Sequence, residues 1–281
     1  MATTEFTPSV SSVTRPTFAA LLERAVREPG LLHDAYRAFH NFSPANQMLA
    51  AVQCAERELP LGPLASFNAW KRKGRHVKRG EKAIWLWQPI ICKRAKETDD
   101  GSDGEPESET FTRFIYRPRW FVLAQTEGAD VEPTATPGWD KARAFAALGI
   151  AEVPFTLLDG NTLGFARGRS VAINPVNPIP HKTTFHEVAH VLLGHTATDT
   201  TTSDGADLPR SLREAEAESV ALLCCESLGL PGAEYARGYI QRWLAGDRIP
   251  ESSAVRIFKA ADAILRAGRL EPDADETLDT D

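Results

Sequence analysis

The feature that most constrains this chain is an apolar segment that carries two histidines four residues apart. His186 and His190 flank Glu187, Val188 and Ala189. Residues four apart leave the same face of a helix, so both imidazoles can bind one metal ion. Glu187 would lie beside that ion, where a carboxylate can take a proton from a bound water. The segment predicts a buried helix with a hydrolytic zinc site. The alternative, two histidines on a solvated helix, would need polar residues in place of Val188 and Ala189.

A hydrolytic zinc site takes a third protein ligand, and two carboxylates downstream are candidates for it. Glu214 and Glu218 share an apolar helix face, whereas Glu216 points away from that face. One of the pair can bind zinc, and the other can accept the ring proton of a ligating histidine. The alternative is a solvated first turn of a helix. His195 lies about half a turn round from the ligand face, which favours a helix-end or substrate-facing role.

Charge is distributed unevenly along the 281 residues, whose net charge is −6. Residues 64–96 contain ten basic residues and one acid, whereas 97–109 and 271–281 carry only acidic charges. Tryptophans are interleaved with the basic residues, as single-stranded nucleic acid binding requires. The DNA-binding candidates are Trp70, Lys71, Arg75, Lys78, Arg79, Lys82, Trp85 and Trp87. The alternative is that Trp85 and Trp87 pack a core while the cations solvate a turn.

The compartment is predicted from what the sequence does not contain. No stretch is apolar over the length of a membrane span, and residues 1–14 resemble a flexible leader rather than an export signal. We expect a cytoplasmic protein with no membrane partner. The four cysteines show no paired spacing and are expected to be reduced thiols.

Apolar spacing predicts three helices between residues 17 and 59, then a short helix at 66–73. Strands are expected at 83–87, where Pro89 would end the first one, and again at 111–116 and at 120–123, with 97–109 as an acidic loop after the first strand. A Pro-rich boundary at 126–140 precedes a helix at 139–148 and a strand at 153–158. A hairpin at 163–174 comes next, and it is the candidate edge for binding an extended peptide.

Three separated motifs in this order resemble the N-terminal domain of ArdC-type antirestriction proteins. They are the run at 39–47, Trp70 with the run at 74–84, and Phe121 with the run at 124–128. The resemblance implies a single-stranded DNA binding domain of the kind found on plasmids and other mobile elements. Val122 and Ala124 stand where that family usually has aspartate and serine, and the acidic loop is an insertion.

The later part of the chain resembles the ImmA/IrrE-like, thermolysin-related zinc peptidases. The matching residues are 172–175, 184–187, Glu214 and 217–218. This resemblance implies zinc bound by His186, His190 and Glu214, with Glu187 as general base and Glu218 supporting a ligand. The family often has asparagine at the position of Glu218, so the choice between Glu214 and Glu218 stays open.

Together these observations predict an α+β fold of two domains. The N-terminal one combines helices with a small antiparallel sheet, and the C-terminal one is a zincin-like metallopeptidase. The expected divisions are a leader at 1–14, a DNA-binding domain at 15–128, a linker at 129–140, a peptidase domain at 141–270 and an acidic disordered tail at 271–281.

The expected function is protection or licensing of incoming DNA by a protein that binds single strands and hydrolyses an unknown peptide or protein substrate. One rival is a non-enzymatic protein that shields DNA and uses zinc only to hold its fold. Another is a regulatory protease that acts on a transcriptional repressor. The presence of Glu187 favours the two enzymatic hypotheses, because a structural zinc site does not require a general base.

Overall fold

The fold is described from a computed structural model, over residues 15–95, 108–132, 135–157, 161–196, 208–244 and 248–270. The predicted leader, the acidic segment 97–107 and the tail 271–281 lie outside these ranges. The four cysteines are free thiols, as expected. In the described part of the chain, no helix combines the length and apolar character that crossing a bilayer would take.

Three helices open the described chain, as the apolar spacing predicted. They are α1 (Phe18–Arg27), α2 (Leu31–Phe39) and α3 (Pro44–Glu56). The Thr17 hydroxyl caps α1 by accepting a hydrogen bond from the Ala20 amide at 3.1 Å. Pro44 begins α3, where its missing N–H costs no helix bond.

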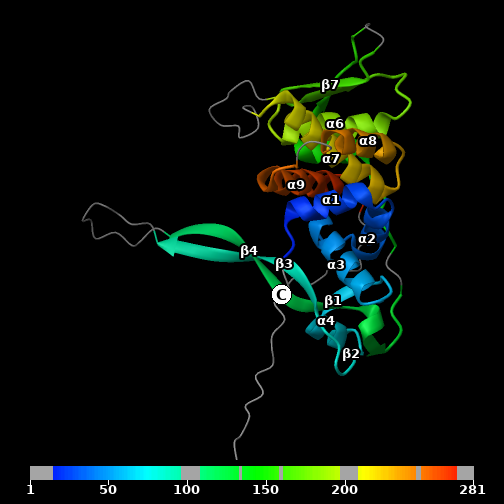
Figure 1. The fold of residues 1–281 in the computed structure, drawn as a ribbon, viewed down its shortest axis with the longest axis vertical. Helices are drawn as coiled ribbons and strands as arrows, with labels where there is room; N and C mark the ends of the chain where they lie inside the picture. Colours follow the sequence, from blue (N-terminus) through cyan, green and yellow to red (C-terminus); the bar gives the residue numbers. More distant parts are fainter. Residues whose placement is uncertain are drawn as a thin grey trace, which may run out of the picture.

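A three-stranded antiparallel sheet follows, in the order β1–β4–β3. Its strands are β1 (Leu64–Ser66), β3 (Ile84–Ala95) and β4 (Ser108–Val122). Around it lie α4 (Phe67–Arg72), η1 (Leu123–Gln125) and the pair β2 (Arg75–Val77) and β5 (Thr126–Gly128). The outer halves of β3 and β4 leave the body as a two-stranded arm (Figure 1).

The expectation that Pro89 ends the first strand is wrong, because β3 runs through it to Ala95. Proline lacks an N–H, which excludes it from most central strands. β3 is the edge strand of its sheet, so only one of its sides needs backbone donors.

The C-terminal part combines a small sheet with four long helices. After α5 (Lys141–Leu148) come β6 (Ala151–Glu152), β7 (Gly164–Arg167) and β8 (Ser170–Ile173), in the sheet order β6–β8–β7. The helices are α6 (Pro180–Leu192), α7 (Arg210–Leu228), α8 (Ala233–Leu244) and α9 (Glu251–Ala267). The hairpin was predicted correctly. The strand expected at 153–158 is wrong over its described part, 153–157: β6 ends at Glu152, and a last backbone bond from the Val153 N–H to the Val171 carbonyl precedes Pro154.

Helices from both ends of the sequence lie side by side: α1 to α3 pack on α7 and α9 (Figure 1). The Glu251 carboxylate accepts hydrogen bonds from the amides of Phe18 and Ala19, where the positive end of α1 favours an anion. One hydrophobic core runs through all these helices. The α+β class is therefore confirmed, while the expected boundary at 129–140 is bridged by a shared core.

Candidate functional site

The helix α6 positions both predicted histidines. Val188 and Ala189 between them are 2% and 0% exposed, and Phe185 just before them is fully buried. This apolar side locks the rotation of α6 in the core. Because His186 and His190 lie one turn apart, both rings then emerge on the side that faces α7.

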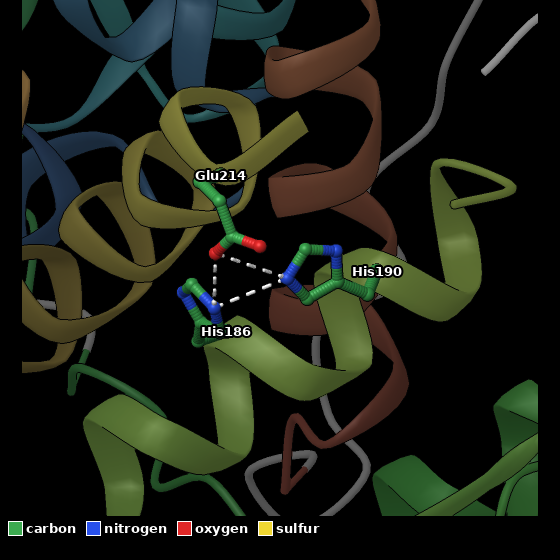
Figure 2. Close-up of side chains that lie close together, drawn as sticks. All are labelled: His186, His190 and Glu214. Carbon is green, nitrogen blue, oxygen red and sulfur yellow. Dashed lines mark hydrogen bonds and ion pairs between the residues drawn. The ribbon is translucent and has the colours of Figure 1, made fainter. Parts of the chain in front are cut away.

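His186, His190 and Glu214 converge on one point (Figure 2). The Nε2 atoms of the two histidines are 3.1 Å apart. Glu214 Oε2 lies 3.4 Å from Nε2 of His186 and 3.7 Å from Nε2 of His190. Ligand atoms on a tetrahedral zinc ion are about 3.3 Å apart, given bonds of about 2.0 to 2.1 Å. The three donor atoms therefore fit a divalent metal ion, and within the described ranges they form the single such cluster of three side chains.

The same geometry distinguishes the two carboxylates that the sequence left open. Glu218 Oε1 lies 3.4 Å from the other ring nitrogen of His186, Nδ1, and also pairs with Lys182. It therefore supports a histidine instead of facing the candidate ion. Glu214 faces the ion, and hydrogen bonds from His186 and His190 hold the pKa of its carboxyl well below the usual range. It is ionised, as a metal ligand must be.

Glu187 follows His186 and lines the cleft in front of the three donors. It is 8% exposed, and this burial raises the pKa of its carboxyl above the ordinary value, against the lowering effect of His186 and His190. A raised proton affinity suits a carboxylate that must accept and return a proton near neutral pH.

The environment of His195 and Glu216 was not predicted from the sequence. The expectation that Glu216 points away from the face of Glu214 and Glu218 is correct, but its carboxylate is fully buried. It lies 2.8 Å from His195 Nε2 and 3.5 Å from the guanidinium of Arg256. The prediction that His195 is not a ligand agrees with this geometry, because His195 Nδ1 contacts the far nitrogen of His190 at 2.9 Å.

An open cleft of about 380 Å³ lies over the candidate metal site. One wall is β7, which contributes Gly164, Phe165 and Ala166. β7 is bonded only to β8, so its other edge is unpaired within its sheet. Arg210 and Arg213 line the wall formed by α7. The cleft therefore combines a strand edge, positive charge and the three donor atoms.

Three of the predicted DNA-binding residues are buried, which contradicts their expected role. Trp70 is 1% exposed and donates its indole N–H to the Phe121 carbonyl at 2.8 Å. Trp87 is 4% exposed and stacks on Phe18 with ring centroids 4.3 Å apart. The guanidinium of Arg75 is bonded to Thr126, Gly128 and Ala129. These side chains hold the fold and cannot reach nucleic acid.

The other candidates keep some exposure. Lys71, Lys78, Arg79 and Lys82 are exposed around β2 and the turn that follows it. Lys78 also donates to the Ala124 carbonyl at 2.9 Å. Trp85 is half-buried, with its ring 5.3 Å from that of Tyr116. A basic surface is therefore present, but of the three candidate tryptophans only Trp85 is exposed enough to contact a base.

The two-stranded arm was not predicted from the sequence. In the antiparallel register Trp87 faces Tyr116, and Pro89 faces Phe114. Opposed residues project on the same face, so a row of rings runs outward from the body. Phe114 is 58% exposed. Exposed Arg113 and Arg117 alternate with this row and project from the other face. The sequence signal that could have indicated this surface is the run 113–117, in which Phe114 and Tyr116 lie between Arg113 and Arg117.

Comparison with known proteins agrees with the motif resemblance. Residues 23–118 match the N-terminal domain of the anti-restriction factor ArdC. The N-terminal domain belongs to the ArdC family. The chain also shares its fold with the metal-free antirestriction ArdC protein of plasmid R388, at 18% identity and a TM-score of 0.53, over 89% of this chain and 97% of that one.

A second structure of the R388 protein, described as Mn(II)-bound, matches with 17% identity and a TM-score of 0.49, over 90% of this chain and 98% of that one. No curated protein sequence matches the chain. The match of residues 23–118 confirms the ArdC resemblance, and the fold shared with the metal-free R388 protein agrees with it, while the ImmA/IrrE resemblance stays a prediction.

Two polar side chains of the ArdC motifs attach the domain's helices and turns to its sheet. The Asn46 amide accepts from the Trp87 N–H at 3.0 Å and donates to the Trp87 carbonyl at 2.9 Å. Gln125 is 1% exposed and bonds to Val122, Glu81 and the Lys82 carbonyl. Buried amides need such partners. These motif residues of the ArdC domain therefore have structural roles.

Proposed function

We propose that this ArdC-type chain binds single-stranded DNA and hydrolyses peptide bonds at a divalent metal site. The observation that carries the peptidase part is the triangle of His186, His190 and Glu214 at the floor of an open cleft, with Glu187 beside it. A structural metal site is closed by four protein ligands, whereas a hydrolytic one keeps a position for water. Three protein donors in a cleft match the second arrangement. Two imidazoles and one carboxylate, with Glu187 directly after the first histidine, are a donor set that hydrolytic zinc sites use.

Glu187 is the general base in this proposal. A bound divalent ion would polarise the scissile carbonyl and acidify a water molecule. Glu187 accepts the proton of the attacking water and then delivers it to the leaving amine. Its burial excludes bulk water from the carboxylate and favours this transfer of one proton in both directions.

The substrate proposed for the cleft is an extended polypeptide. The free edge of β7 offers backbone N–H and C=O groups to a segment that adds to the sheet as another strand. A strand added to β7 would run along the cleft that Glu187 also lines.

Tyr239, Arg210 and Arg213 are the donors available to a developing oxyanion. Burial raises the pKa of the Tyr239 phenol, and the nearby charges of Glu214 and Glu218 raise it further. It is therefore a neutral donor. Arg237, also on α8, is bonded to Glu226 and to the Ala25 and Val26 carbonyls. It is not available to a substrate.

The peptidase proposal is tested with Glu187→Gln, which preserves shape but removes the base. Zinc-loaded wild type should cleave extended peptides, and Glu187→Gln should bind as much zinc and lose about 10²- to 10⁴-fold in turnover. Glu152→Gln, at an exposed carboxylate on β6, serves as the matched control. Equal turnover in wild type and Glu187→Gln would refute the mechanism. A zinc-dependent fold without hydrolysis in any variant would favour the structural-zinc rival.

The DNA proposal rests on the arm and the basic turn of the ArdC domain. Single strands are held by cations that neutralise phosphates and by rings that stack on bases. Phe114 and Tyr116 supply rings along the arm, and Arg113 and Arg117 supply charge. This row replaces the platform expected from Trp70 and Trp87.

The two basic surfaces can be separated by their salt dependence. Each lost phosphate contact should flatten the plot of log affinity against log salt by about 0.7 unit for a single strand. We expect this change for Arg113→Ala with Arg117→Ala on the arm. Arg79→Ala with Lys82→Ala tests the turn in the same way. Titration of labelled single strands, with a duplex control, measures both. Unchanged slopes in both pairs would remove the DNA proposal.

A further inference from the structure

Behind His190, on the side away from the candidate ion, lies a chain of buried polar groups. His190 Nδ1 is 2.9 Å from His195 Nδ1, and His195 Nε2 is 2.8 Å from Glu216 Oε2. The side chains of His195 and Glu216 are 2% and 0% exposed. The chain therefore joins a metal-facing histidine to a carboxylate that has no access to solvent.

The end of α6 is built to make this contact. Gly194 has a left-handed φ of 75°, and the His195 amide donates to the His190 carbonyl at 2.9 Å. This reversal is the usual glycine ending of a helix. It folds the His195 ring back over His190, where a continuing helix would carry it about half a turn away.

The hydrogen positions in the chain follow from its two ends. The Nε2 of His190 faces His186 and Glu214, so a metal there needs its lone pair. A neutral imidazole has one N–H, so the hydrogen of His190 must sit on Nδ1. His195 Nδ1 must then accept, which puts the His195 hydrogen on Nε2, aimed at Glu216. Glu216 accepts this hydrogen, so each of the two N–H groups meets an acceptor.

We propose that His195 and Glu216 are positioning residues that hold His190 in the tautomer required for metal binding. The inference rests on the metal site of the proposed function, but not on hydrolysis. Glu216 accepts from His195, and His195 accepts from His190. Outer partners of this kind fix the ring orientation of a ligating histidine and raise its basicity. Arg256, 3.5 Å from Glu216, balances the charge of the carboxylate.

A simpler role for the same cluster would be to join α6, α7 and α9. Glu216 and Arg256 alone would link α7 to α9. A purely structural role therefore does not require the contact between His195 and Nδ1 of His190. The experiment must therefore measure the state of His190 and not only the stability of the fold.

The direct measurement needs no substitution. Long-range proton–nitrogen NMR on zinc-loaded protein with labelled histidine reports which nitrogen carries hydrogen in each of the seven histidines. The proposal expects His190 with hydrogen on Nδ1 and zinc on Nε2, and His195 with hydrogen on Nε2. Hydrogen on Nδ1 of His195 would overturn it, because two donors would then face each other.

Variants test the consequence for metal affinity, measured by competition with a chelator. His195→Leu removes the acceptor and should weaken zinc binding about 10- to 100-fold. His195→Gln should recover most of this loss, because its carbonyl can accept from His190 while its amide donates to Glu216. Glu226→Gln, at another buried carboxylate of α7, should leave zinc affinity unchanged. Equal affinity in wild type and His195→Leu, or no recovery in His195→Gln, would refute the positioning role.

Discussion

Replacing Trp87 by alanine should destabilise the fold without acting on DNA contacts. The ring is 4% exposed, stacks on Phe18 with an interplanar angle of 7°, and lies under the Arg15 guanidinium, 5.7 Å from the ring centroid. Phe18 also contacts Phe258 of α9, with ring centroids 5.8 Å apart. Trp87 thus packs where the arm, α1 and α9 meet. Truncating a buried tryptophan to alanine costs about 3 to 5 kcal/mol, including about 0.5 to 1.5 kcal/mol for the aromatic pair.

The assay is urea unfolding followed by circular dichroism, paired with DNA titration of the folded protein at several salt concentrations. Trp87→Ala should lose about 3 to 5 kcal/mol of unfolding free energy and keep the salt slope and affinity of wild type. Phe114→Ala, at an exposed ring of the arm, should stay within about 0.5 kcal/mol of wild type in stability and weaken DNA binding. A stable Trp87→Ala that has lost DNA affinity would refute the reasoning and restore Trp87 as a stacking residue.

Three further predictions concern the contacts that hold the site and the ArdC domain. Arg237→Met should cost about 3 to 5 kcal/mol in urea unfolding, because it leaves the buried Glu226 carboxylate without its cation, while zinc content per folded chain stays unchanged. Gly194→Ala should cost about 1 kcal/mol, because its φ of 75° disfavours a side chain, and should also weaken zinc binding in a chelator competition. Asn46→Ala should cost about 1 to 3 kcal/mol in the same unfolding assay, since it leaves buried backbone groups of Trp87 unpaired.

The candidate metal donors could be predicted because their placement depends on local helix geometry. A spacing of four residues puts His186 and His190 on one face whatever surrounds them. The same spacing assigned Glu214 and Glu218 to one face. It could not choose between them, because the choice depends on which nitrogen of His186 each carboxylate meets. That is fixed by how α7 crosses α6.

The failures involve contacts between distant segments. Helix periodicity gave the direction of Glu216, but only the turn at Gly194 and the position of α9 show that His195 and Arg256 meet it. Alternation put Trp87 on the face opposite Leu86, yet both are buried, because α1 covers the face of Trp87. The residues of β3 predicted the strand, but they do not show on their own that both of its faces are covered.

The proposed metal site can be tested directly by anomalous diffraction at the zinc edge from crystals of the zinc-loaded protein. We expect one peak per chain between His186, His190 and Glu214, with bonds of about 2.0 to 2.2 Å, a water-accessible fourth position, and Glu218 and His195 outside the ligand set. A zinc ion closed in by a fourth protein ligand, or bound elsewhere in the chain, would contradict it.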